Sequence, residues 1–303
     1  MIFIKNDFIK PDLAERDFFS VPKHFASIVN ATLFNGKHVL LPQDVFEIDS
    51  SESMIVDHNG EERLRDLIKK VVIDGKVILI GIECQNKSKK NMVVRSCHYD
   101  SLRYLKELKA KNKADAILTI VLYFHEYRWK NPKSIYACVN EFPDELRKYI
   151  NNWKLNLYDI KDIEPETIDE EETRTFMEAL QLIYQIKRNP RKLPKDLKMN
   201  KDIALRVASI TKFPILLEKV KQTKEGGVIH MCDALRMMKK CSREDGIKYG
   251  KKKGIKQERQ KMRLIEKRNV QTMLSEGLSI ETIAKYLSLT ETQVKSYAKA
   301  ISN

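Results

Sequence analysis

Cysteine is scarce in this sequence, and long hydrophobic runs are missing. The five cysteines are odd in number, widely separated and without a Cys-x-x-Cys pair, which argues against a disulfide framework or a zinc ribbon and fits a reducing compartment. The longest apolar runs, such as Ala116 to Phe124, are too short to cross a bilayer, and the first residues do not resemble a secretory leader. We therefore expect a soluble, cytoplasmic protein without a membrane partner.

Acidic residues are too few to balance the basic ones. The chain has 56 lysines and arginines against 42 aspartates and glutamates, a net charge of +14. This excess favours a polyanionic partner or an anionic surface without identifying it. The six histidines are scattered without metal-ligand spacing, so we assign them no catalytic role. A length of 303 residues predicts roughly two domains.

The first part of the chain, residues 1–155, has the element order of an α/β fold. In chain order, hydrophobic periodicity and composition predict a helix over 12–34, a strand over 38–46, two strands over 66–73 and 76–85, a helix over 91–109 and a buried strand over 114–124. The expected core contacts of the second helix are Val94, Leu102, Leu105 and Leu108. We predict a mixed sheet with flanking helices.

The two central strands are joined by Asp74-Gly75, a two-residue hairpin turn. In such a hairpin Ile73 pairs with Lys76, so Asp66 falls opposite Glu83 with the Cβ atoms roughly 5 Å apart. Carboxylates this close repel each other unless a cation such as Mg²⁺ neutralises them, and Gln85 shares their face. Two alternatives stay open: both carboxylates are solvated ends of an edge hairpin, or a one-residue bulge breaks the register.

The second half of the chain is predicted to be helical. We expect a helical region over 156–245, a basic helical connector over 246–268 and a tail over 269–303. The connector is densely basic, and Lys252 and Lys256 are its candidate DNA contacts. Solubility is an equally good explanation of its charge.

The tail contains three short helical segments, the second beginning with Ser279 as an N-terminal cap. A short turn between the last two segments is the helix-turn-helix arrangement, in which the last helix enters the major groove. Its candidate base-contacting side chains include Gln293 and Lys295. The alternative is a small bundle that serves packing or self-association into a homo-oligomer.

Several segments, in this order, resemble a known family. They are Asn30-Ala-Thr-Leu-Phe-Asn-Gly36, Arg65-Asp-Leu-Ile-Lys-Lys70, Gly81-Ile-Glu-Cys-Gln85, Met92-Val-Val-Arg95 with Tyr99-Asp100, Leu122-Tyr123, Met231-Cys-Asp-Ala-Leu235 and Gly277-Leu-Ser-Ile-Glu-Thr-Ile-Ala284. The chain resembles the Rpn family of recombination-promoting nucleases and transposases, within the PD-(D/E)XK nuclease superfamily. The resemblance covers most of the chain. It implies a bacterial, nucleoid-associated DNA endonuclease that depends on Mg²⁺ or Mn²⁺ and acts in recombination or on mobile elements.

The resemblance also implies roles for individual residues. Asp66 matches the metal-binding aspartate, Glu83 and Gln85 match a Glu-x-Gln motif, and the backbone carbonyl of Cys84 is a further metal ligand. Gln85 stands where the wider superfamily has lysine, so it can orient the attacking water but cannot supply positive charge. Members of the family often have aspartate where this chain has Ser27, and Glu15 or Asp17 could compensate.

The missing positive charge has three candidate sources: Lys69, Lys70 and Lys87. The hairpin register points Lys70 to the Asp66 face and Lys69 to the other, which favours Lys70 as a catalytic side chain. Arg95 and Arg103 are eight residues apart, on roughly one side of a helix, and are candidate phosphate contacts. The competing interpretation is a weakened or inactive nuclease-fold protein that acts as a DNA-binding module, and a third is a purely structural oligomerisation protein.

Overall fold

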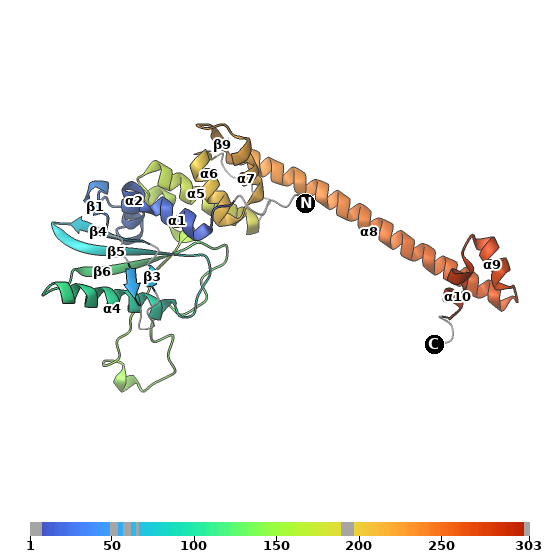
Figure 1. Ribbon diagram of the computed structural model, residues 1–303, viewed down its shortest axis with the longest axis horizontal. Helices are drawn as coiled ribbons and strands as arrows, with labels where there is room; N and C mark the ends of the chain where they lie inside the picture. Colours follow the sequence, from blue (N-terminus) through green and yellow to red (C-terminus); the bar gives the residue numbers. More distant parts are fainter. Residues whose placement is uncertain (1–7, 49–53, 57–61, 65–66, 189–196, 300–303) are drawn as a thin grey trace. The chain divides into compact units, whose positions relative to one another are not determined.

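The computed structural model describes residues 8–48, 54–56, 62–64, 67–188 and 197–299 (Figure 1). The chain forms two compact units, Met1–Leu235 and Arg236–Asn303. Asp66 lies outside the described residues.

The first unit is built on a five-stranded sheet in the order β1-β4-β5-β6-β7. Its strands are β1 Val45–Phe46, β4 Leu67–Ile73, β5 Lys76–Gln85, β6 Ala116–Tyr123 and β7 Asn156–Asp159. The pairs β1–β4 and β4–β5 are antiparallel, whereas β5–β6 and β6–β7 are parallel. This confirms the predicted mixed sheet with flanking helices. The sheet also includes β7, which lies beyond the domain boundary predicted at residue 155.

The β4–β5 hairpin has the predicted turn. Asp74 and Gly75 both have positive φ, 50° and 69°, as a type I′ turn requires. The pairs run without a bulge from Ile73 with Lys76 to Leu67 with Ile82. The predicted register is therefore confirmed over the described residues of the hairpin.

Helices cover both faces of the sheet: Figure 1 shows α1 and α2 on one side and α4 on the other. The helices of this unit are α1 Pro11–Ser20, α2 Pro22–Leu33, α4 Met92–Ala110, α5 Glu171–Arg188, α6 Lys201–Thr211 and α7 Pro214–Gln222. Short 3-10 turns are η1 Pro42–Asp44, η2 Asp144–Leu146, η3 Ile160–Asp162 and η4 Pro165–Thr167. Two small hairpins pair β2 Met54–Val56 with β3 Glu62–Leu64 and β8 Lys198–Asn200 with β9 Val228–His230.

Two predicted elements of the N-terminal region were wrong in detail. The helix expected over 12–34 is two helices, because Pro22 places Val21 in an extended conformation (ψ 126°) and starts α2. The strand expected over 38–46 is only Val45–Phe46, since Pro42 begins a 3-10 turn instead.

Helix α4 forms as predicted but turns a different face to the core. Val94, Leu105 and Leu108 are each more than half exposed. The buried positions include Tyr99 and the charged side chains of Asp100, Arg103 and Glu107. The apolar spacing predicted the wrong face of α4, because two of its charged side chains, Arg103 and Glu107, are paired inside the protein.

The second unit contains the three helices predicted for the tail. They are the end of α8 (Met231–Ser275), α9 Ile280–Leu287 and α10 Glu291–Lys299. The Ser279 side chain accepts a hydrogen bond from the backbone N–H of Thr282, which confirms the predicted cap. The apolar core of the three helices is Val270, Ile283, Ala284 and Val294. Within the described ranges, no helix combines the length and apolar composition that crossing a membrane requires.

Candidate active site

The end of β5 carries the two predicted side chains that the structure describes, Glu83 and Gln85. β5 is an inner strand between β4 and β6, so both side chains are buried: their residues are 1% and 3% exposed. They alternate with Cys84, which is buried on the opposite face, as predicted. Buried carboxylates need a compensating charge, and the neighbours of Glu83 supply one.

Arg95 of α4 provides this charge. Its Nη2 lies 2.5 Å from Oε2 of Glu83, and its guanidinium stacks 5.7 Å from the centre of the Tyr99 ring. The Arg95 side chain is one-fifth exposed. The structure therefore places this predicted phosphate contact on the candidate metal ligand, where it neutralises Glu83.

Helix α1 brings two carboxylates to the same strand end. Asn86, which follows β5, donates from Nδ2 to Oδ1 of Asp12 and to Oε2 of Glu15, both at 3.2 Å. Glu15 is fully buried, whereas Asp17 is exposed beside Arg16. Glu15 and Asp17 were the two acids predicted to compensate for the serine at position 27. Of these, Glu15 is the one that reaches the end of β5. Asp12 and Asn86 were not predicted as site residues, because an exposed helix start and a loop amide carry no periodic signal in the sequence.

Ser27 forms hydrogen bonds within the protein and does not take the place of a metal ligand. Its hydroxyl donates to Oδ1 of Asp169 at 2.5 Å and accepts the backbone N–H of Glu170 at 3.3 Å. These contacts fasten α2 to the segment that precedes α5.

The lysines near the hairpin differ in position. Lys70 pairs with Leu79, four residues before Glu83 on β5, a separation of roughly 13 Å along the strand. Lys69 is fully buried and forms an ion pair with Glu47. Lys87 is exposed two residues after Gln85. Lys87 is thus closer along the chain to the end of β5 than Lys70, the side chain that we predicted.

Arg103 lies in the interior and not on a surface that could face DNA. Its side chain is 6% exposed, and Nη2 donates to Oε1 of Glu107 at 3.1 Å. Oε2 of Glu107 accepts the backbone N–H of Asp115, and Thr119 of β6 donates to Oδ1 of Asp100 at 2.6 Å. These buried hydrogen bonds attach α4 to the sheet.

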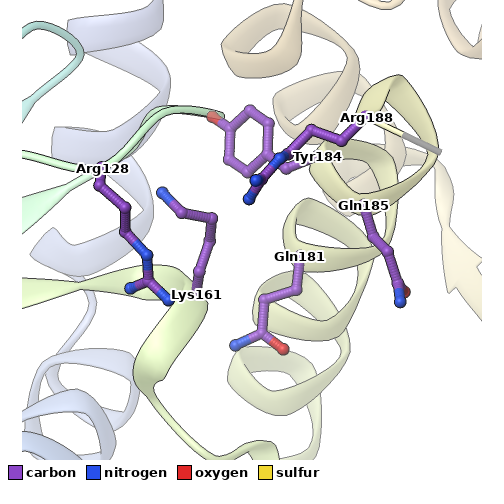
Figure 2. Close-up of a pocket in the computed structure, with 6 residues that line it drawn as sticks. All are labelled: Arg128, Lys161, Gln181, Tyr184, Gln185 and Arg188. Carbon is purple, nitrogen blue, oxygen red and sulfur yellow. The ribbon is translucent and has the colours of Figure 1, made fainter.

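A cavity lies beyond the carboxyl ends of β6 and β7. Figure 2 shows its lining residues, which come from the segments that follow the two strands and from α5. They are Arg128, Lys161, Gln181, Tyr184, Gln185 and Arg188. The cavity has a volume of about 560 Å³, which is within the range of ligand-binding sites.

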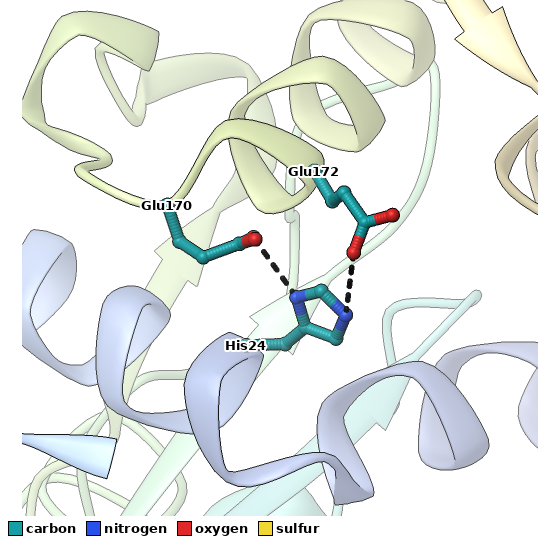
Figure 3. Close-up of side chains that lie close together, drawn as sticks. All are labelled: His24, Glu170 and Glu172. Atoms are coloured by element: carbon teal, nitrogen blue, oxygen red, sulfur yellow. Dashed lines mark hydrogen bonds and ion pairs between the residues drawn. The ribbon is translucent and has the colours of Figure 1, made fainter.

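A separate polar cluster joins α2 to the start of α5 (Figure 3). Nδ1 of His24 lies 3.0 Å from Oε2 of Glu170, and Nε2 lies 3.8 Å from Oε2 of Glu172. Burial opposes ionisation of Glu170, but hydrogen bonds from Thr173 and Lys23 outweigh it and lower the pKa to about 2. Burial lowers the pKa of His24. The three groups could together hold a metal ion, but the ammonium of Lys23 already forms ion pairs with both carboxylates.

In the tail, the predicted base contacts Gln293 and Lys295 bind residues at the start of α10, Thr290 and Glu291. Oε1 of Gln293 accepts the backbone N–H of Thr290 at 2.8 Å, and Oγ1 of Thr290 accepts the backbone N–H of Gln293 at 3.3 Å, a reciprocal capping box. Lys295 is paired with Glu291 at 3.3 Å but remains exposed. Lys256 is exposed, and the side chain of Lys252 lies outside the described residues.

Comparison with known proteins identifies the family. The family model described as "Putative transposase, YhgA-like" matches residues 12–204, well over half of the chain. The chain belongs to this family. The match confirms the resemblance to transposases of the Rpn type and, in this YhgA-like protein, includes the whole five-stranded sheet and the buried Glu83. Neither the search of curated proteins nor the search of solved structures found a match.

Proposed function

We propose that this YhgA-like protein is a divalent-metal-dependent DNA endonuclease that acts in recombination or on mobile elements in the bacterial nucleoid. The observation that carries the proposal is the buried carboxylate of Glu83 at the end of an inner strand, beside Gln85. Helix α1 supplies two further carboxylates to Asn86, at the same strand end. A family of transposases acts on phosphodiester bonds, so such acids have a use in it.

The donor atoms suit a hard cation. Carboxylate, amide and carbonyl oxygens are the ligands that Mg²⁺ and Mn²⁺ prefer. Glu83 and the carbonyl of Cys84 would hold the ion, with Asp66 as a third ligand by sequence. When bound, the ion lowers the pKa of a coordinated water and neutralises charge on the phosphate.

The protein's own side chains have distinct roles in this proposal. Arg95 balances the charge of Glu83, which offsets the cost of burying a carboxylate in the resting protein. Gln85 positions the attacking water by hydrogen bonding. Lys87, exposed just past the strand, contributes positive charge toward the scissile phosphate.

Cleavage of supercoiled plasmid DNA tests the proposal. We expect nicking with Mg²⁺ or Mn²⁺ that is abolished by EDTA and reduced at least a hundredfold in Glu83→Gln. Glu218→Gln, an exposed glutamate of α7, is the matched control and should retain activity. Circular dichroism should show that both variants are folded. Metal-dependent cleavage by folded Glu83→Gln at the normal rate would refute the assignment of the site.

A second candidate function is metal-independent DNA binding without cleavage. The Arg95–Glu83 ion pair favours it, because a ligand that already has a cationic partner binds a metal less readily. Ser27 favours it too, since its hydroxyl is committed to Asp169. Binding of DNA in EDTA, with no nicking by the unmodified protein in either metal, would establish this function instead. Self-association through the tail stays a prediction.

A further inference from the structure

We propose that the cavity lined by Arg128, Lys161, Gln181, Tyr184, Gln185 and Arg188 binds a backbone phosphate of the DNA strand, beside the candidate active site. The inference rests on the proposed function in one respect, namely that DNA is the ligand. Its test is independent of catalysis.

The lining of the cavity is chemically suited to an anion. Three of the six residues are cationic and none is acidic. The other three, two amides and a phenol, add no negative charge. The amide of Gln181 donates to the backbone carbonyls of Ile160 and Ile163, which fixes it in the wall of the cavity. The volume of about 560 Å³ exceeds that of a small cleft between side chains and can admit a sugar-phosphate unit.

Two of the cations are held in place by contacts beneath them. Nζ of Lys161 lies 2.7 Å from Oδ1 of Asp159 and donates to the carbonyl of His125. Arg128 forms ion pairs with Asp159, at 3.6 Å, and with Asp162. The two aspartates offset two of the three positive charges, so the cavity keeps an excess of one. Such fixed donors reduce the entropy lost on binding.

The third cation, Arg188, is the most available. It is the last residue of α5 and exposed, and in the part of the chain that the structure describes its guanidinium forms no ion pair. Figure 2 shows the side chain of Arg188 extending from α5 toward Lys161, whereas the amide of Gln185 points away from Lys161. A guanidinium in this position can form two parallel hydrogen bonds to one phosphate.

The cavity also lies at a useful distance from the candidate site. Tyr123 is paired with Gln85 of β5 on one side and with Asp159 of β7 on the other. Two strand spacings therefore separate Gln85 from Asp159, roughly 10 Å. That separation corresponds to about three nucleotides at 3.4 Å each, so one DNA strand could reach both positions.

Site-specific cross-linking tests the inference in the full chain. A photoreactive benzoylphenylalanine replaces Gln185, and a labelled DNA duplex is added in EDTA, so cleavage plays no part. We expect a cross-link to DNA that falls at least fivefold in the Arg188→Gln background and is retained with Arg188→Lys. Fluorescence anisotropy should show an affinity about tenfold lower for Arg188→Gln and a salt dependence shallower by about one ion.

Controls separate this inference from the nuclease proposal and from a free-phosphate site. Arg147→Gln removes an exposed arginine outside the cavity and should leave the cross-link unchanged. Glu83→Gln should also leave it unchanged, even where cleavage is lost. A cross-link that Arg188→Gln does not weaken, or an affinity for DNA that Arg188→Gln does not lower, would overturn the inference. So would complete competition by millimolar inorganic phosphate, because the cavity would then be a site for free phosphate.

Discussion

The interiors of the two units differ in composition. In Met1–Leu235, buried charges stand among the apolar side chains with charged partners: Arg103 with Glu107, and Glu83 with the one-fifth exposed Arg95. In Arg236–Asn303, every buried side chain in the described part is apolar: Val270, Ile283, Ala284 and Val294. A buried ion pair adds little net stability, but the loss of one partner is costly. The first unit should therefore be sensitive to single charge changes, and the second to changes of volume.

This difference matters for function. The Arg95–Glu83 pair lies at the end of β5, where the candidate metal ligand is a buried carboxylate that needs a compensating charge. The tail has no such requirement, so a small apolar core is enough to orient its helices.

The largest expected effect is that of Arg103→Met. The substitution keeps most of the side-chain volume but leaves Glu107 as a buried charge without its arginine. We expect the free energy of unfolding of the first unit to fall by about 3–5 kcal/mol. Urea denaturation followed by tryptophan fluorescence measures it selectively, because both tryptophans, Trp129 and Trp153, lie in that unit.

Two comparisons sharpen this measurement. Arg147→Met changes an exposed arginine and should cost no more than about 0.5 kcal/mol. The double variant Arg103→Met/Glu107→Leu should recover part of the loss, since no uncompensated charge remains. A loss below about 1 kcal/mol for Arg103→Met alone would show that the pair is not a critical part of the interior.

The same contrast explains what the sequence could predict. The Asp74-Gly75 turn, the β4–β5 register and the Ser279 cap follow from local rules, and all were confirmed. The face of α4 was not predictable from apolar spacing, because the buried partners Arg103 and Glu107 look like surface residues in a sequence. Similarly, nothing local indicates that Arg95 meets Glu83, since that contact needs α4 packed on the sheet. Asp66 opposite Glu83 stays a prediction.

A smaller effect is expected from pH. The folded-state pKa of Glu170 is lowered from 4.5 to about 2, and that of His24 is also lowered. Since both lie below their unfolded values, the stabilisation is present at neutral pH and is lost as pH falls, first through 6.5 for His24 and then from 4.5 toward 2 for Glu170. After allowance for solvent screening, Glu170 should contribute about 1 kcal/mol.

Glu170→Gln tests this dependence. Between pH 6 and pH 3, tryptophan-monitored unfolding should lose less stability in the variant than in the unmodified protein. Glu218→Gln, on the exposed face of α7, should keep the original pH dependence. Identical curves for Glu170→Gln and the unmodified protein would mean that the cluster is not coupled to folding.

The smallest expected effect is that of Leu105→Gln, which tests the reversed face of α4. Leu105 is 55% exposed, so a polar side chain there should change the free energy of unfolding by no more than about 0.5 kcal/mol. Ile283→Ala, in the core of the tail, should instead cost about 2–5 kcal/mol in that unit, measured by hydrogen exchange of α9. A loss above about 1.5 kcal/mol for Leu105→Gln would show that this leucine is covered after all, and that apolar periodicity governs both units alike.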